Sequence, residues 1–262
     1  MSRPSVTDAL IALAPQLRPT PCLLDDIEGA RHAEVKVLLL DMLDGLRRIG
    51  RGETRGCWFD ATPLDPEARS LLSSMLGQGE VSVTVTGPQP VQIRESTLQG
   101  LWMVDGPGRQ GIELADLPEV VLRTVASAGE RLDLPAVDAL PAGAMNVLPV
   151  LAEIKHHMGI AGDPHEINLT LLPMTEVDLQ MLDSVLGQGA VEIWARGYGS
   201  CRIVSCAAGQ VWRIHYFNSE DRMILDLIQV GGVPVAARAT EEDMAESAVR
   251  LEELISAYFP KS

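Results

Sequence analysis

The segment Gly187–Ser219 reads GQGAVEIWARGYGSCRIVSCAAGQVWRIHYFNS and holds the densest cluster of glycines and aromatic residues in the chain. An earlier copy of this segment lies 110 positions upstream. Gly187-Gln188-Gly189 aligns with Gly77-Gln78-Gly79, and Trp212 aligns with Trp102. The alignment has no gap from Pro63/Pro173 to Val104/Ile214. A fixed offset between two long segments indicates a duplicated unit.

Hydrophobic spacing predicts a similar order of elements in both copies. The first copy reads as a strand, a helix, several strands and a helix, at 57–61, 66–76, 81–85, 91–93, 98–104 and 118–126. The second reads as 165–172, a helix after Thr175, 191–196, 202–205, 211–217, 223–230 and a helix after Thr240. We therefore predict an α+β fold with two related repeats, each a mostly antiparallel sheet covered by helices.

Two domains follow from this pattern: a divergent N-terminal repeat at 1–130 and a C-terminal repeat at 140–262. The boundary is the proline-containing segment 129–143. Residues 1–30 are rich in proline and lack a clear period, so the first helix is predicted at 35–46, with Gly50 as a possible cap. Trp102 and Trp212 are expected to anchor the two cores, whereas Trp58 and Trp194 could be exposed.

The composition and net charge of the chain disfavour some classes of partner. The chain has 262 residues, 46% apolar content and a net charge of -15. This acidity disfavours nucleic acid and anionic membranes as partners, and either serves solubility or attracts a basic protein. The acidic face of the last helix, Glu241–Glu253, is where such attraction is expected. No signal peptide or membrane span is expected, four cysteines do not form a disulfide scaffold, and a cytoplasmic location fits best.

Motifs for catalysis are lacking: there is no phosphate-binding GK[ST], no G-x-S-x-G, and Gly197-Tyr198-Gly199 lacks a third glycine. Cys201, Cys206 and His215 are weak candidates for metal ligands, since their spacing matches no standard zinc site. On one strand, Cys201 and Cys206 would face opposite sides. We therefore expect no catalytic residues and no resident cofactor or metal.

Cys201 has two interpretations. Gly197 and Gly199 could bend the strand and leave the thiol partly exposed, where Arg202 would lower its pKa. Alternatively, Cys201 fills a small buried site, in which case burial would raise its pKa.

Several motifs of the second repeat resemble those of the HupH/HyaF family of hydrogenase expression proteins. They are N-L-T-L-L-P (168–173), L-G-Q-G (186–189), R-G-Y-G-S-C-R (196–202), V-W-R-I-H-Y-F-N-S (211–219), V-P-V-A-A-R-A (233–239) and E-D-M-A-E-S-A (242–248). The first repeat resembles the more variable N-terminal half of the family. Ser200 departs from the pattern, which has Asn at this position, so partner binding could differ here.

The resemblance implies a non-enzymatic maturation chaperone for a [NiFe] uptake hydrogenase. Its partners would be the iron–sulfur small subunit, before assembly and export, and other maturation proteins. Candidate partner-binding residues are Trp194, Gly197, Tyr198, Gly199, Cys201, Arg202, Tyr216 and Asn218. Two alternatives remain at this point: a metal or iron–sulfur carrier using Cys201, Cys206 and His215, and a thiol-dependent transferase.

Overall fold

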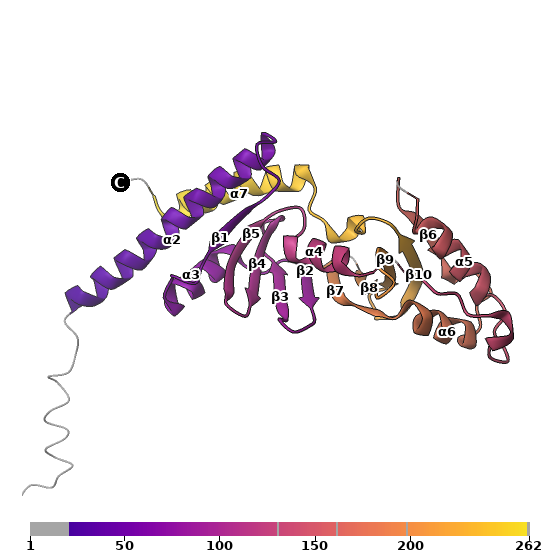
Figure 1. Cartoon of the computed structure of the whole chain (residues 1–262). Coiled ribbons are helices and arrows are strands. Elements are labelled where there is room, and N and C mark those ends of the chain that lie inside the picture. Colours follow the sequence, from indigo (N-terminus) through magenta and orange to yellow (C-terminus); the bar gives the residue numbers. More distant parts are fainter. Residues whose placement is uncertain (1–20, 130, 161, 198, 261–262) are drawn as a thin grey trace, which may run out of the picture.

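The computed structural model describes residues 21–129, 131–160, 162–197 and 199–260 (Figure 1). Its helices are α2 (Pro21–Gly50), α3 (Pro66–Leu76), α4 (Glu119–Ser127), α5 (Val147–His157), α6 (Glu176–Leu186) and α7 (Glu241–Tyr258), with short 3-10 helices η2 (Val137–Ala139), η3 (Leu169–Leu171) and η4 (Val235–Ala237). Its strands are β1 (Cys57–Asp60), β2 (Val81–Val85), β3 (Val91–Glu95), β4 (Leu101–Gly106), β5 (Arg109–Leu114), β6 (His165–Asn168), β7 (Gln188–Gly197), β8 (Gly199–Cys206), β9 (Val211–Phe217) and β10 (Met223–Val230).

These ten strands form one antiparallel sheet in the order β1-β5-β4-β3-β2-β7-β8-β9-β10-β6. The predicted α+β class with mostly antiparallel strands is confirmed. Each half of the chain contributes five neighbouring strands, and in each half the first strand pairs with the last. The halves join where β2 pairs with β7, with Val83 opposite Ile193. The prediction of a separate sheet for each repeat is therefore wrong, because this pairing joins the strands of both halves into one continuous sheet.

Three hydrophobic clusters cover the sheet. One side packs centrally against α4 and η4, through residues such as Val83, Ile193 and Val121. The other side packs near β1, β5 and β4 against α2, α3 and α7. Toward β10 and β6 that second side packs against α5 and α6. Figure 1 shows β3, β2 and β7 between α3 and α6.

Trp102 and Trp212 anchor the cluster on the α4 side, as predicted. Both side chains are 0% exposed. The indole Nε1 of Trp102 donates to the carbonyl of Ala115 at 2.9 Å, and that of Trp212 donates to the carbonyl of Gly232 at 2.8 Å. A buried indole N–H needs such a partner, so each ring is fixed by packing and by one hydrogen bond.

Helices α3 and α6, each of which precedes a run of strands, have the same kinds of capping residue at their two ends. Asp65 caps α3 by accepting from the Ala68 N–H at 2.7 Å, and Thr175 caps α6 in a capping box with Asp178. At the C-terminal ends, Gly77 and Gly187 have φ of 65° and 60°, a region that favours glycine. These local signals fix where each helix begins and ends.

Asp178 also tethers the linker between the halves. Its Oδ1 accepts from the N–H groups of Met145, Asn146 and Val147 at 2.8, 3.0 and 3.1 Å, while Oδ2 accepts from Thr175. Burial alone would raise the pKa of this carboxyl, but these hydrogen bonds lower it to about 2. One carboxylate thereby binds the starts of both α5 and α6.

Three elements differ most from the sequence prediction. Helix α2 begins at Pro21, inside the segment predicted to be irregular. Strand β5 was not predicted, because Arg109–Leu114 has no simple alternation of apolar and polar residues. The strand predicted at 165–172 ends at Asn168, where η3 begins. Tertiary packing decides these boundaries, since β5 is buried between β4 and β1 and continues the sheet.

Glu95 is a buried carboxyl in the core of the N-terminal half, only 4% exposed. Its Oε1 accepts from the Gly100 N–H at 3.0 Å. Burial raises its pKa to about 7, despite that hydrogen bond, and the charges of Asp243 and Glu80 add to the increase. Because the folded state holds the proton more tightly than the unfolded state, this group costs stability as pH rises from about 4.5 to about 7.

We predict that Glu95→Gln stabilises the protein increasingly with pH. The gain in free energy of unfolding over the wild type should be about 2 to 3 kcal/mol larger at pH 8 than at pH 5. Urea unfolding at both pH values measures it, and Glu246→Gln on the exposed side of α7 is the control. An equal effect of Glu95→Gln at both pH values would contradict the buried-carboxyl interpretation.

Candidate functional site

The side of the sheet opposite α4 is accessible along its central strands, and we call this region the open face. Its residues alternate with the buried ones that pack on α4. They are partly or fully exposed: Ser82, Thr84, Gln92, Arg94, Glu192, Trp194, Arg196, Arg202, His215 and Phe217. Strand register places Arg94, Ser82, Trp194, Arg202, His215 and Asp226 in one row across six strands.

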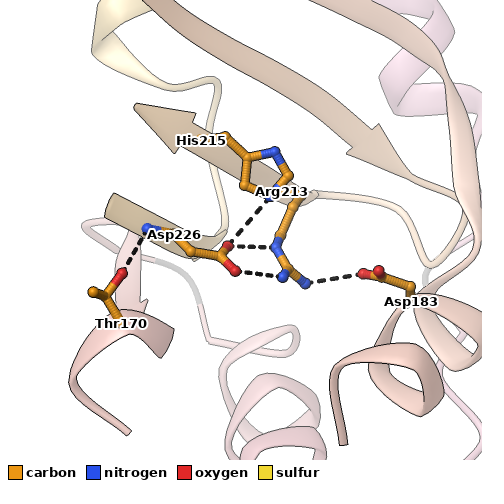
Figure 2. Close-up of polar contacts among 5 residues, drawn as sticks. All are labelled: Thr170, Asp183, Arg213, His215 and Asp226. Carbon is orange, nitrogen blue, oxygen red and sulfur yellow. Dashed lines mark hydrogen bonds and ion pairs between the residues drawn. The ribbon is translucent and has the colours of Figure 1, made fainter. Parts of the chain in front are cut away.

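Arg213 is the centre of a polar network at one end of the open face. Figure 2 shows its guanidinium between two carboxylates. Nε and Nη2 donate to the two oxygens of Asp226, each at 2.6 Å, and Nη1 donates to Asp183 of α6 at 3.0 Å. The side chains of Arg213 and Asp226 are 11% and 9% exposed. This bidentate pair thus connects β9, β10 and α6.

Two further contacts hold Asp226 in place. Nε2 of His215 lies 3.4 Å from Asp226 Oδ1, and the Asp226 N–H donates to Thr170 Oγ1 at 2.8 Å (Figure 2). Burial alone would raise the pKa of Asp226, but the hydrogen bonds from His215 and Arg213 and the guanidinium charge hold it below its usual range. The members of this network bind one another, which is the pattern of a structural support.

An aromatic and cationic group lies beside this network. The rings of Trp194 and Phe217 stack with centroids 6.1 Å apart, and the guanidinium of Arg202 lies 5.8 Å from the Trp194 ring. Glu192 accepts from Arg202 Nε at 2.7 Å and from the Trp194 indole at 3.1 Å. Trp194 and Arg202, both candidates from the sequence, are therefore in contact on the open face.

The sheet separates the other candidates. Cys201 and Tyr216 are cross-strand partners on the α4 side, and the Tyr216 hydroxyl donates a hydrogen bond to the Cys201 sulfur. Cys201 is 6% exposed. Burial raises the pKa of its thiol, against the opposing effect of the Tyr216 hydrogen bond. Of the two interpretations of Cys201, the structure supports the buried one, because strand alternation directs Cys201 and Arg202 to opposite faces.

The glycine motif forms the β7–β8 hairpin. Gly197 pairs with Gly199, and Tyr198 between them lies outside the described residues. Gly199 has a φ of 107°, and an added Cβ would lie 2.9 Å from the carbonyl oxygen of Phe217. Glycine is therefore required here both for backbone conformation and for the close approach of β9. Asn218 shapes the next hairpin, since its Oδ1 accepts from the N–H groups of Glu220 and Arg222.

The weak metal candidates are not brought together. Cys201 lies in the cluster under α4, whereas Cys206 lies in the cluster with α5 and α6 on the other side, so their predicted separation is confirmed. Burial raises the pKa of Cys206 to about 12. Among the residues that the structure describes, no group of three or more His, Cys, Asp or Glu side chains could hold a metal ion. Cys201 and Cys206 therefore cannot share one ion in this fold.

Sequence reasoning missed the Arg213 network and Arg94. The network's members are far apart in the chain, because Thr170, Asp183 and Asp226 come from three different elements. One signal was available: Arg213 lies between the apolar residues Trp212 and Ile214 of its strand, and a buried arginine needs a carboxylate partner. Arg94 could not be identified from the sequence, because it lies in the same row as Trp194 only through the pairing of β2 with β7.

In the part of the chain that the structure describes, the fold is α+β with a ten-stranded antiparallel sheet, one face of which presents aromatic and charged side chains to solvent. Within the described residues, no helix is long and apolar enough to cross a bilayer. Residues 34–130 and 144–258 match the family model described as "HupH hydrogenase expression protein, C-terminal conserved region". The chain therefore belongs to the HupH family of hydrogenase expression proteins.

Related proteins align with this chain over most of its length. The hydrogenase expression/formation protein HupH of Rhodobacter capsulatus is 38% identical over 237 residues, covering 89% of this chain and 85% of the relative. HoxQ of Cupriavidus necator is 41% identical over 244 residues, covering 90% and 86%. The hydrogenase-1 operon protein HyaF of Escherichia coli is 30% identical, covering 90% and 88%. A solved HupH structure from Thiobacillus denitrificans is 30% identical, with a TM-score of 0.40, and covers 43% of this chain and 96% of its own.

We predict that removing one partner of the buried pair destabilises the protein strongly. Asp226→Ala should lower the free energy of unfolding by about 3 to 5 kcal/mol, because it leaves the Arg213 guanidinium without its main partner in a buried site. Asp183→Ala is the matched control: this carboxylate is 68% exposed, and its loss should cost about 1 kcal/mol or less. Urea unfolding measures both, and equal effects would contradict the assigned burial.

A second prediction concerns the thiols. A variant carrying Cys22→Ser and Cys57→Ser keeps Cys201 and Cys206 alone. Iodoacetamide at pH 8 should modify neither in the native protein, because both are buried and their thiol pKa values are raised. Both should react once urea unfolds the chain, as mass spectrometry can follow. Rapid native modification of Cys201 would restore the exposed-thiolate interpretation.

Proposed function

We propose that this protein is a non-enzymatic maturation chaperone for a [NiFe] uptake hydrogenase. It would act in the cytoplasm and bind the iron–sulfur small subunit before that subunit joins the large subunit and is exported. The observation that carries this proposal is the set of relatives named for hydrogenase expression or formation, which match this chain over about nine-tenths of its length. Binding rather than catalysis would be its mode of action.

Two surfaces of opposite charge support binding as its mode of action. The exposed side of α7 carries acidic residues, including Glu241, Glu242, Glu246 and Glu253. On the open face, aromatic and arginine side chains are accessible. Aromatic and arginine side chains are the types most enriched at protein interfaces, and the acidic helix would steer a basic region of the partner at low ionic strength.

We also propose that the chain is a duplication, with an N-terminal repeat at 1–130 and a C-terminal repeat at 140–262. Its support is the shared strand order, the paired indoles of Trp102 and Trp212, and the glycine caps Gly77 and Gly187, which lie 110 residues apart. Helix α7 departs from this scheme, because it packs against α2 of the first half. The repeats would thus be related units, and the last helix of the second, α7, packs on the first.

Co-purification tests the function. The tagged chain is produced in cells that synthesise the hydrogenase, and bound proteins are identified by mass spectrometry. We expect retention of the unassembled small subunit, with less of it in cells where the large subunit is also present in excess. Deleting the gene for this chain should lower hydrogenase activity. Normal activity in the deletion strain, together with no retained subunit, would refute the chaperone role.

A further inference from the structure

We propose that the centre of the open face binds an extended acidic segment of a partner protein. We call the binding residues the arginine strip: Arg94 of β3, Trp194 and Arg196 of β7, and Arg202 of β8. The inference rests on the proposed function only for the identity of the partner, a hydrogenase component. The chemistry of the surface is independent of that identity.

Strand register sets the spacing of the strip. Arg94, Ser82, Trp194 and Arg202 are successive cross-strand neighbours on β3, β2, β7 and β8. With strands about 4.8 Å apart and about 3.3 Å per residue along a strand, the backbone positions of the two unpaired arginines, Arg94 and Arg196, are separated by roughly 12 Å. An extended segment rises about 3.3 Å per residue, so carboxylates about three to four residues apart match this separation. The row can therefore receive a peptide that crosses the strands.

The charged side chains of the open face indicate that the bound segment is acidic. Arg94 and Arg196 are exposed, and within the part of the chain that the structure describes neither forms an ion pair. Arg202, in contrast, pairs with Glu192. The open face thus presents two guanidiniums without an ion-pair partner, within a chain whose net charge is -15. They attract carboxylates, which a guanidinium can bind with two hydrogen bonds, while the overall acidity repels nucleic acid.

A cavity at the strip accommodates one partner side chain. It has a volume of about 340 Å³ and is lined by Gln78, Gly79, Glu80, Ser82 and Arg196. Beside it, the half-buried Trp194 ring stacks on Phe217 and offers an apolar surface. Because Glu80 contributes a negative charge to the lining, a polar or aromatic side chain fits the cavity better than a carboxylate. The acidic residues of the segment would then lie over the unpaired guanidiniums of Arg94 and Arg196, while Arg202 keeps its ion pair with Glu192.

Charge reversal tests the strip against a matched control. The double variant Arg94→Glu/Arg196→Glu changes the net charge by the same amount as Arg123→Glu/Arg250→Glu, whose residues are exposed on α4 and α7. Binding of the small subunit is measured by biolayer interferometry after thermal melts confirm that both variants fold. We expect the strip variant to bind at least tenfold more weakly than the wild type, and the control to bind within twofold of it.

A peptide probe separates this inference from the proposed function. A fluorescein-labelled peptide of four glutamates and a central phenylalanine is titrated into the full chain and followed by anisotropy, with the lysine analogue as control. We expect the glutamate peptide alone to bind, and Arg94→Glu/Arg196→Glu to abolish binding. If it binds while no hydrogenase component does, the strip stands and the proposed partner fails. The proposal is overturned if Arg94→Glu/Arg196→Glu weakens the binding of neither the small subunit nor the glutamate peptide. It is also overturned if the lysine peptide binds more tightly than the glutamate peptide.

Discussion

The pairing of β2 with β7 is the interaction on which the rest of the structure depends. Each half of the chain would otherwise end in an exposed edge strand with unpaired N–H and C=O groups, a template for aggregation. The two edges satisfy each other in five residue pairs from Val81/Ala195 to Val85/Val191. Val83 and Ile193, which are 110 residues apart in the chain, face each other at the centre and are both buried.

This pairing gives the two sides of the sheet different roles. On one side, α4 packs across the junction and buries an apolar core that contains both tryptophans. On the other side the helices stay near the two ends, so the polar side chains of β2, β3, β7 and β8 face solvent. The Arg213 network then braces α6 against the sheet beside that surface. The accessible face is thus supported by the same contacts that stabilise the second half.

The two halves differ in the polarity of their cores. In the first, Trp102 is flanked across the sheet by Glu95 and Glu113, and burial raises the pKa of both carboxyls. In the second, Ser205 and Gln229 flank Trp212 and carry no charge. The strand order is alike in the two halves, but beside these tryptophans the first half buries two carboxyl groups and the second buries neutral side chains.

The sequence predicted the parts of the fold that depend on local signals. The caps Asp65, Thr175 and Thr240 and the glycines after α3 and α6 marked helix ends, and alternation in Val81–Val85 marked a strand with one buried face. The opposite orientations of Cys201 and Cys206 followed from the period of two along a strand. Strand β5 escaped prediction because its burial pattern depends on neighbours on both sides.

The candidate site was less predictable from sequence. Trp194 and Arg202 were identified and lie together, but Cys201 was expected on the same surface and lies on the opposite one. Arg94 and Asp183 could not be assigned, because only strand order and helix packing bring them to this face. Local sequence patterns report which face a residue takes along its own strand, whereas the composition of a surface depends on which strands are neighbours.

Helix α7 has a consequence for the synthesis of the chain. Its residues Met244, Leu251 and Ile255 complete a cluster otherwise built from α2, α3 and the first strands, and Glu252 pairs with Arg47. The N-terminal half is synthesised first, but its core is completed only after α7 has been synthesised. Until α7 has been synthesised, the part of α2 that packs against it remains uncovered in the nascent protein, and a chain truncated before α7 would carry that exposed surface permanently.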